Sequence, residues 1–351
     1  MLTAIANGKH VVTANKALIA VHGNEIFKAA HEKGVIVAFE AAVAGGIPVI
    51  KSLREGLGAN RIEWVAGIIN GTGNYILTHM RDEGRAFEDV LAEAQALGYA
   101  ESDPTFDVEG IDAAHKLTIL ASIAYGVPLQ FEKAFTEGIS RITAEDVEQA
   151  DNLGYVIKHL GISKRTDQGL ELRVRPTLIP KERLLANVHG VKNAIAIMGD
   201  AVGPTLYYGA GAGAEPTASA VVADLLDVAR DISTDHHYRV PYLAFSGIDE
   251  DVSQLPIMPM EDITTAYYLR LLAVDRPGVL ARVATILAEQ GISIEALIQK
   301  EATEGELVPI ILLTHRTKEK QMNEAIREIE SMADIAGPLT RIRVESLDEG
   351  E

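Results

Sequence analysis

The densest group of chemically versatile side chains lies between positions 98 and 116, where five carboxylates precede a lysine. Asp112 and Lys116 are four positions apart, so on a helix they share one face and can form an ion pair. Residues 117–121 are all apolar apart from one threonine, which predicts a buried helix whose lysine points into a cleft, where it can give or take a proton. An exposed helical ion pair beside an acidic loop fits the same spacing. The carboxylates are Glu101, Asp103, Asp107, Glu109 and Asp112.

The first fifty residues predict a βαβ unit of a parallel sheet. A helix over 2–7 is followed by a strand over 10–13, a helix over 24–32 and a strand over 35–40. Because the chain begins inside a helix with no strand before it, we expect the opening units of this sheet to lie outside the sequence.

The rest of the chain predicts two further domains. Residues 50–255 mix strands (62–69 and a largely strand-like stretch over 170–197 with Pro180 in a loop) with helices (87–97, 111–125 and a buried one over 217–230). The helix region 215–235 is expected to rejoin the first domain. Residues 255–260 contain two prolines and are interpreted as a linker. Residues 264–345 follow the order βαββαβ, which is typical of a ferredoxin-like domain.

The segment from Gly98 to Lys116 resembles the signature of homoserine dehydrogenases. It reads Gly-Tyr, an acidic residue, Asp-Pro and then Asp-x-x-Gly-x-Asp-x-x-x-Lys, and every position matches. Residues 275–280, Asp-Arg-Pro-Gly-Val-Leu, resemble the opening of an ACT domain, a regulatory module that binds small ligands. The resemblance covers essentially all 351 residues, and four further segments follow the same family: 12–16, 40–48, 70–75 and 209–219.

The resemblance implies an α/β fold with three parts. These are a partial Rossmann-like parallel sheet (1–49), an α+β catalytic and dimerisation domain (50–255) and a ferredoxin-like ACT domain (264–345). It also implies an oxidoreductase that interconverts L-homoserine and L-aspartate 4-semialdehyde with NADP or NAD, in threonine, methionine and isoleucine biosynthesis. A homodimer or homotetramer and a threonine effector at the ACT domain follow by the same analogy.

The resemblance also assigns roles to residues. Lys116 would donate the proton to the aldehyde oxygen, and Lys16 would touch both cofactor and substrate. Asp112 is assigned to catalysis and, with Glu101, to the substrate ammonium group. The neighbouring substrate contacts would be Asp107 and Tyr99, and the cofactor contacts Lys16, Asn15, Gly98, Gly211 and Gly213.

Several of these segments have a simpler structural interpretation as well. The glycine-rich stretches 70–73 and 209–213 are also compatible with tight turns, and Lys16 with a solvated strand end. For residues 40–47 the resemblance implies a site for a monovalent cation such as Na⁺, held mostly by backbone oxygens. A strand that ends in a glycine turn fits residues 40–47 equally. The cation ligands would be Glu40, Val43, Gly45 and Ile47. We interpret the adjacent pair His236–His237 as part of a solvated loop.

Charge, composition and missing motifs limit the binding partners and the cellular compartment that we expect. The net charge of −18 disfavours nucleic acid or an anionic membrane as a partner. The absence of cysteine, of a signal-peptide pattern and of a long uncharged apolar run predicts a cytoplasmic protein without membrane spans. No G-x-G-x-x-G turn is present, so the choice between NADP and NAD stays open.

Two other function classes remain at this stage. The first is a catalytically inactive remnant that keeps oligomerisation and amino-acid binding through residues 264–345. The second is another aldehyde or hydroxy-acid dehydrogenase, which would give no reason for the set of Glu101, Asp112 and Lys116.

Overall fold

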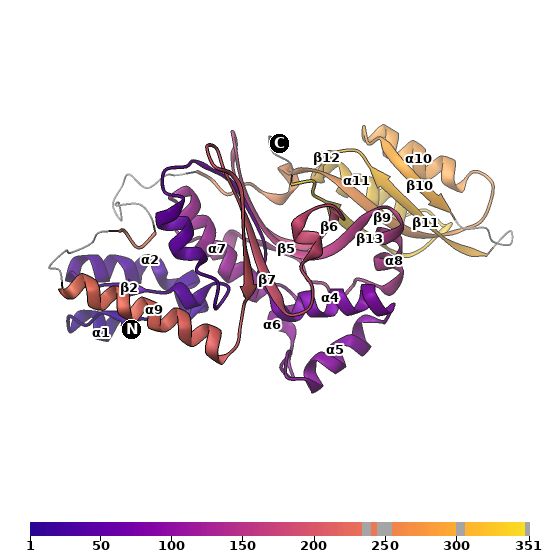
Figure 1. The fold of residues 1–351 in the computed structure, drawn as a ribbon. Helices are drawn as coiled ribbons and strands as arrows, with labels where there is room; N and C mark the ends of the chain where they lie inside the picture. The colour runs from indigo at the N-terminus through magenta and orange to yellow at the C-terminus, as the bar shows by residue number, and fades with distance from the viewer. Residues whose placement is uncertain (234–239, 244–254, 300–305, 348–351) are drawn as a thin grey trace.

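The computed structural model describes residues 1–233, 240–243, 255–299 and 306–347, which form three regions in chain order (Figure 1). The pair His236–His237 lies outside these residues. The N-terminal region contains the expected βαβ unit, with two short strands paired in parallel. Its elements are α1 (Leu2–Ala6), β1 (Val11–Val12), α2 (Lys16–Lys33), β2 (Val37–Ala38), η1 (Glu40–Ala42), α3 (Val49–Lys51) and η2 (Ser52–Gly56).

Two predicted boundaries in this region are wrong. Helix α2 begins at Lys16 rather than Asn24, because the Asn15 side chain accepts a hydrogen bond from the Leu18 N–H and caps the helix at 3.0 Å. Strand β2 covers only Val37–Ala38, because the chain turns into η1 immediately afterwards.

The long helix α9 (Ala214–Ser233) returns from the middle of the chain and lies against β1, β2 and η1 (Figure 1). It buries Ala220 and Val228, but it is not the buried helix that its composition predicts. Half or more of the Val222, Leu226 and Ile232 surfaces is exposed, because α9 packs through one face only.

The middle region is a sheet covered by helices, and its strands pair antiparallel except for one short strand over 135–136. The strand-like stretch predicted over 170–197, with Pro180 in a loop, is two strands: the first ends at Pro180, η4 (Leu184–Asn187) follows, and the second begins at Lys192. The neighbouring strands over 155–166 and 203–210 were not predicted. The strands are β3 (Ile62–Ile68), β4 (Phe135–Thr136), β5 (Tyr155–Thr166), β6 (Gly169–Pro180), β7 (Lys192–Gly199) and β8 (Gly203–Ala210). The helices are α4 (Gly71–Glu83), α5 (Phe87–Ala96), α6 (Thr105–Val108), α7 (Ile111–Tyr125), η3 (Phe131–Lys133) and α8 (Ala144–Asn152).

Helix α7 is the central support of the site. It lies between α2 and the β5–β6 hairpin, and its apolar residues are buried on nearly every side. Left-handed glycines stand at both of its ends, Gly110 with φ 83° and Gly126 with φ 64°. Asp112 and Lys116 are therefore carried on a rigid, desolvated element, with 4% and 9% of their surfaces exposed.

The C-terminal region has the expected βαββαβ order, which confirms the ferredoxin-like prediction. Its sheet is antiparallel in the order β10-β11-β9-β13, and β13 also pairs in parallel with β6 of the middle region. One sheet thus runs through both regions. The elements are η5 (Met260–Asp262), β9 (Thr264–Val274), α10 (Val279–Glu289), β10 (Ile294–Gln299), β11 (Leu307–Thr314), β12 (Thr317–Lys318), α11 (Glu319–Glu330) and β13 (Ile335–Val344).

The predicted linker is also part of this structure. The carbonyl of Pro256 accepts a hydrogen bond from the Leu170 N–H, and the Met258 N–H donates to the Leu170 carbonyl, each at 2.8 Å. The prolines therefore do not make a free connection, because strand β6 offers an edge to which residues 256–258 can pair.

Asp146 of α8 and Arg270 of β9 form a buried ion pair between the two regions, with Arg270 Nε 2.6 Å from Asp146 Oδ1. Replacing Asp146 by Ala leaves a half-buried guanidinium without its carboxylate and removes a helix cap, so the free energy of unfolding should fall by about 3–5 kcal/mol. Urea unfolding measures this loss. The matched control is Glu145→Ala, which removes the more exposed partner of the same arginine, 3.5 Å away, and should cost about 1 kcal/mol or less. Equal losses in the two variants would contradict the assignment.

Candidate functional site

Two lysines from different helices share one carboxylate where the N-terminal and middle regions meet. Lys116 Nζ lies 2.7 Å from Asp112 Oδ2, and Lys16 Nζ lies 3.2 Å from Asp112 Oδ1. Lys116 also donates to the carbonyl of Ile69 at 2.7 Å, at the end of β3. The predicted i, i+4 pair is therefore present and buried, and the start of α2 brings a second cation to it.

Asn70 completes this cluster, although sequence reasoning did not assign it to the site. Its side-chain nitrogen donates to Asp107 at 2.7 Å and to Asp112 at 2.9 Å, while its oxygen accepts from the Gly73 N–H at 2.8 Å. Residues 70–73 thus form the start of α4 and not a tight turn. An asparagine directly before a helical segment is the signal that identifies such a cap.

The two carboxylates of the cluster have opposite electrostatic environments. Burial alone would raise the pKa of Asp112, but Lys116 and Lys16 outweigh it and hold that pKa below its ordinary value. Burial raises the pKa of Asp107, and the nearby Asp112 charge acts in the same direction. Asp112 is consequently a permanent anion around which the two ammonium groups are fixed.

The cluster borders a cavity of about 610 Å³ that lies where α2, α4, α7 and the start of α9 meet. Most of the predicted site residues line it together: Lys16, Gly45, Gly98, Tyr99, Glu101, Asp107, Asp112, Lys116, Gly211 and Gly213. Four predicted residues are not in this lining. Asn15 uses its side chain to cap α2, and Glu40, Val43 and Ile47 are buried beside the cavity.

The stretch 209–213 is the end of β8 and the connection to α9. A Cβ atom on Gly211 would lie 1.1 Å from Asn193 Oδ1, and one on Gly45 would lie 2.6 Å from the Gly211 carbonyl oxygen. These glycines are required by close approach of backbone segments at the cavity wall. Asn193, which sequence reasoning missed, holds this wall by donating to the Ile68 carbonyl at 2.7 Å.

The carboxylate of Glu40 has a structural use. Its two oxygens accept hydrogen bonds from the Ile50 and Lys51 N–H groups at 2.9 Å, and burial raises its pKa to about 7. Within the described residues no group of three acidic or histidine side chains is arranged for a metal. The cation that the resemblance implies at residues 40–47 would use backbone carbonyls, not such a group.

A buried lysine outside the signature supports another wall of the cavity. Lys158 of β5 donates to Asn74 Oδ1 at 3.1 Å and to the Val188 carbonyl at 2.5 Å. Asn74 in turn donates to the Gly190 carbonyl at 2.8 Å. These bonds tie the first turn of α4 to the loop that carries Val191 and Lys192, both of which line the cavity.

Comparison with known proteins finds homoserine dehydrogenases that match nearly the whole chain. A family model described as homoserine dehydrogenase matches residues 48–226, one described as homoserine dehydrogenase, NAD binding domain, matches 1–40, and the ACT domain model matches 267–334. The homoserine dehydrogenase of Pseudomonas aeruginosa is 68% identical over 349 residues, which cover 99% of this chain and 80% of that protein. The chain belongs to the homoserine dehydrogenase family.

Solved homoserine dehydrogenases share the fold. The crystal structure from Thiobacillus denitrificans superposes with a TM-score of 0.94 at 65% identity, covering 99% of this chain and 79% of that one. A hyperthermophilic archaeal homoserine dehydrogenase in complex with NADPH gives a TM-score of 0.57 at 30% identity, covering 66% of this chain and 67% of that one.

The family sets the reaction. The enzyme is an NAD(P)-dependent oxidoreductase that interconverts L-homoserine and L-aspartate 4-semialdehyde in the biosynthesis of threonine, methionine and isoleucine. The similarity to homoserine dehydrogenases extends through residues 98–116 as well as the ACT domain, which disfavours the inactive-remnant alternative. None of the described helices has the length and apolar character needed to cross a membrane.

Burial lowers the pKa of Lys158 from 10.5 to about 7, with the Arg81 charge acting in the same direction. Between these two values the unfolded chain binds one more proton than the folded chain at this residue, so the contribution of Lys158 to the free energy of unfolding should rise with pH. The slope can reach about 1.4 kcal/mol per pH unit. Urea unfolding at pH 7 and pH 9 should show the wild type gaining stability relative to Lys158→Met. The exposed Lys133→Met control should not change this slope, and parallel wild-type and Lys158→Met profiles would contradict the prediction.

Proposed function

We propose that Lys116 is the proton donor and acceptor of the reaction and that Asp112 and Lys16 hold it in place. The observation that carries this proposal is the convergence of both ammonium groups on the buried Asp112 carboxylate. The aldehyde oxygen of aspartate semialdehyde would bind beside Lys116 and receive its proton. In the opposite direction Lys116 would take the proton of the homoserine hydroxyl. Charge that develops on that oxygen is stabilised by two cations fixed in advance in a desolvated site.

The substrate ammonium group requires an anion that is not already neutralised. Asp112 is surrounded by Lys116, Lys16 and Asn70, whereas the Glu101 carboxylate has no hydrogen-bond or ion-pair partner among the described residues. We therefore assign the main contact to Glu101 at the cavity mouth, with Asp112 as the deeper carboxylate. Asp107 and the half-exposed Tyr99 also line the cavity and are proposed as neighbouring contacts.

The residues of the cavity fit a nicotinamide cofactor, which when bound exchanges the hydride with the substrate carbon. Gly211 and Gly213 present backbone without side chains at the start of α9, where free N–H groups favour an anionic or polar ligand. Gly98, with φ 77°, and Thr72 belong to the same lining. Lys16 is proposed to touch both cofactor and substrate, and Asn15 to act by fixing the start of its helix.

We assign the three regions separate tasks. Residues 1–49 with the helix region 215–235 hold the cofactor, residues 50–255 carry the catalytic groups and pair subunits into a homodimer or homotetramer, and residues 264–345 regulate. The proposed effector is threonine, at the cavity of about 450 Å³ bordered by residues 274–280. The cytoplasm is the proposed compartment.

A monovalent cation such as Na⁺ is proposed at the carbonyls of Glu40, Val43, Gly45 and Ile47. The chain reverses there through Ala44 and Gly45, both with positive φ, and the turn donates from the Gly46 N–H to the Ala210 carbonyl at 3.0 Å. Replacing Na⁺ by choline at equal ionic strength should therefore loosen the 210–213 wall and raise KM for the cofactor severalfold. Steady-state kinetics in the two salts measures this, and an identical KM would contradict the proposal.

Replacing Lys116 by Met should lower kcat about 10²–10⁴-fold in both directions, because the proton-transfer group is lost while the side-chain volume is kept. The measurement is homoserine-dependent reduction of NADP⁺ or NAD⁺. Lys133→Met, at an exposed lysine remote from the cavity, is the control and should retain full activity. Cofactor binding by the Lys116 variant, followed by calorimetry, separates lost chemistry from lost folding. An unchanged kcat would remove Lys116 from its role.

A further inference from the structure

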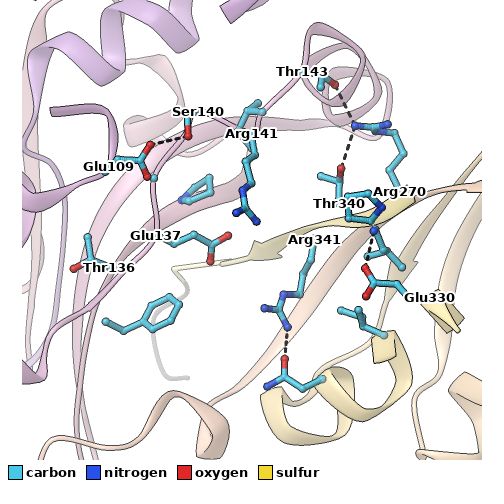
Figure 2. Close-up of a pocket in the computed structure, with 18 of the residues that line it drawn as sticks. Glu109, Thr136, Glu137, Ser140, Arg141, Thr143, Arg270, Glu330, Thr340 and Arg341 are labelled. Atoms are coloured by element: carbon cyan, nitrogen blue, oxygen red, sulfur yellow. Dashed lines mark hydrogen bonds between the residues drawn. The ribbon is translucent and has the colours of Figure 1, made fainter. Parts of the chain in front are cut away.

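A second, larger cavity of about 1440 Å³ lies between the middle and C-terminal regions, away from the catalytic cluster (Figure 2). One wall is the segment 135–143 that precedes α8. The opposite wall comes from α11 and from residues 338–341 of β13. Four arginines (141, 270, 327 and 341) and four glutamates (109, 137, 261 and 330) line it.

Some of these charges are already neutralised by residues outside the cavity or beside it. Arg270 is paired with Asp146, and Arg341 Nη1 lies 3.0 Å from Glu319 Oε1. One oxygen of Glu137 accepts from Arg343 at 2.5 Å. These ion pairs hold the walls of the cavity in place. The lining as a whole has equal numbers of arginines and glutamates.

Arg141 is different, because it has no hydrogen-bond or ion-pair partner within the part of the chain that the structure describes. Figure 2 shows its side chain extending into the cavity toward the side that carries Glu137 and Arg341. No ion pair joins Arg141 to Glu137, whose second oxygen is left without a partner among the described residues. Glu137 is already neutralised by Arg343, whereas Glu109 accepts only from the Ser140 hydroxyl and has no ion-pair partner among the described residues. Arg141 and Glu109 are thus a cation and an anion of the same lining that no ion pair neutralises.

We propose that this end of the cavity binds a free α-amino acid as its zwitterion. The Arg141 guanidinium would take the carboxylate with its planar pair of N–H donors, and Glu109 would take the ammonium group, with the second oxygen of Glu137 as a further acceptor. A wall with equal numbers of arginines and glutamates suits a ligand that carries one charge of each sign. The net charge of −18 further disfavours a polyanion. The volume exceeds that of an amino acid, so the ligand occupies only the Arg141 end.

The proposed site is connected to the catalytic helix by direct contacts. Ser140 Oγ donates to Glu109 Oε1 at 2.7 Å, and the Ile139 N–H donates to the Val108 carbonyl at 2.9 Å. A Cβ on Gly138 would lie 2.2 Å from Glu109 Oε2, so the two segments touch closely. Glu109 is followed by Gly110, which starts α7 two residues before Asp112. A ligand that moves residues 138–141 therefore acts on the carboxylate that holds Lys116.

The test is calorimetric titration of the intact protein with each of the twenty standard amino acids, followed by repetition with Arg141→Ala. At least one amino acid should bind the wild type, and its affinity should fall about tenfold or more in the variant, because a charge-assisted bidentate contact is lost. Arg141 is exposed and makes no partner contact among the described residues, so the variant should keep its thermal stability and catalytic activity. Retained activity with lost binding separates this proposal from the assignment of Lys116.

Arg276→Ala is the matched control, because Arg276 lines the smaller cavity at residues 274–280. Binding that survives Arg141→Ala but is lost in Arg276→Ala would overturn the proposal, and so would the failure of every amino acid to bind. The bound amino acid should also change KM for homoserine, and Ser140→Ala, which removes the Glu109 contact, should reduce that change. Binding with an unchanged KM would keep the site and overturn its connection to α7.

Discussion

The site depends on one buried carboxylate that two lysines share. Asp112 lies on a helix with almost no access to water, and a charge in that position is stable only when it is paired and hydrogen-bonded. Lys116 from the same helix, Lys16 from α2 and Asn70 from α4 provide the pairing. The Asp112 carboxylate thereby holds α2, α4 and α7 together and also positions Lys116, the proposed proton donor. The contacts that stabilise the packing of these helices are the same ones that order the site.

Sequence patterns predicted the elements of the fold that have a strong local signal. The amphipathic helices of the C-terminal region, the βαββαβ order and α7 with its flanking glycines all follow from spacing and capping residues. The start of α2 was missed because Asn15 stands directly after a strand and its capping bond is formed only in the folded turn. The burial of α9 was overestimated because periodicity shows that a helix is apolar, but not how much of its apolar surface meets another element.

In the site, too, local contacts could be predicted from the sequence, and contacts between distant segments could not. The i, i+4 spacing of Asp112 and Lys116 made their ion pair predictable from the chain alone. The contribution of Lys16 is a contact between residues nearly a hundred positions apart, and only the family resemblance suggested it. Asn193 and Lys158 had no local signal at all, because an isolated polar residue in a strand is usually solvated. Each of these side chains donates a hydrogen bond to a backbone carbonyl, Asn193 to Ile68 and Lys158 to Val188, and these contacts exist only in the folded chain.

The pairing of β13 with β6 has a mechanical consequence. Because the strands of the C-terminal region continue the sheet of the middle region, the two are joined by backbone hydrogen bonds and by the buried pair of Asp146 with Arg270, not by a hinge. Swinging one region as a rigid body would break both. Small shifts of segments beside the shared sheet, such as residues 138–141, would cost less free energy than such a rotation. A bound effector would therefore act through these segments while the sheet stays rigid.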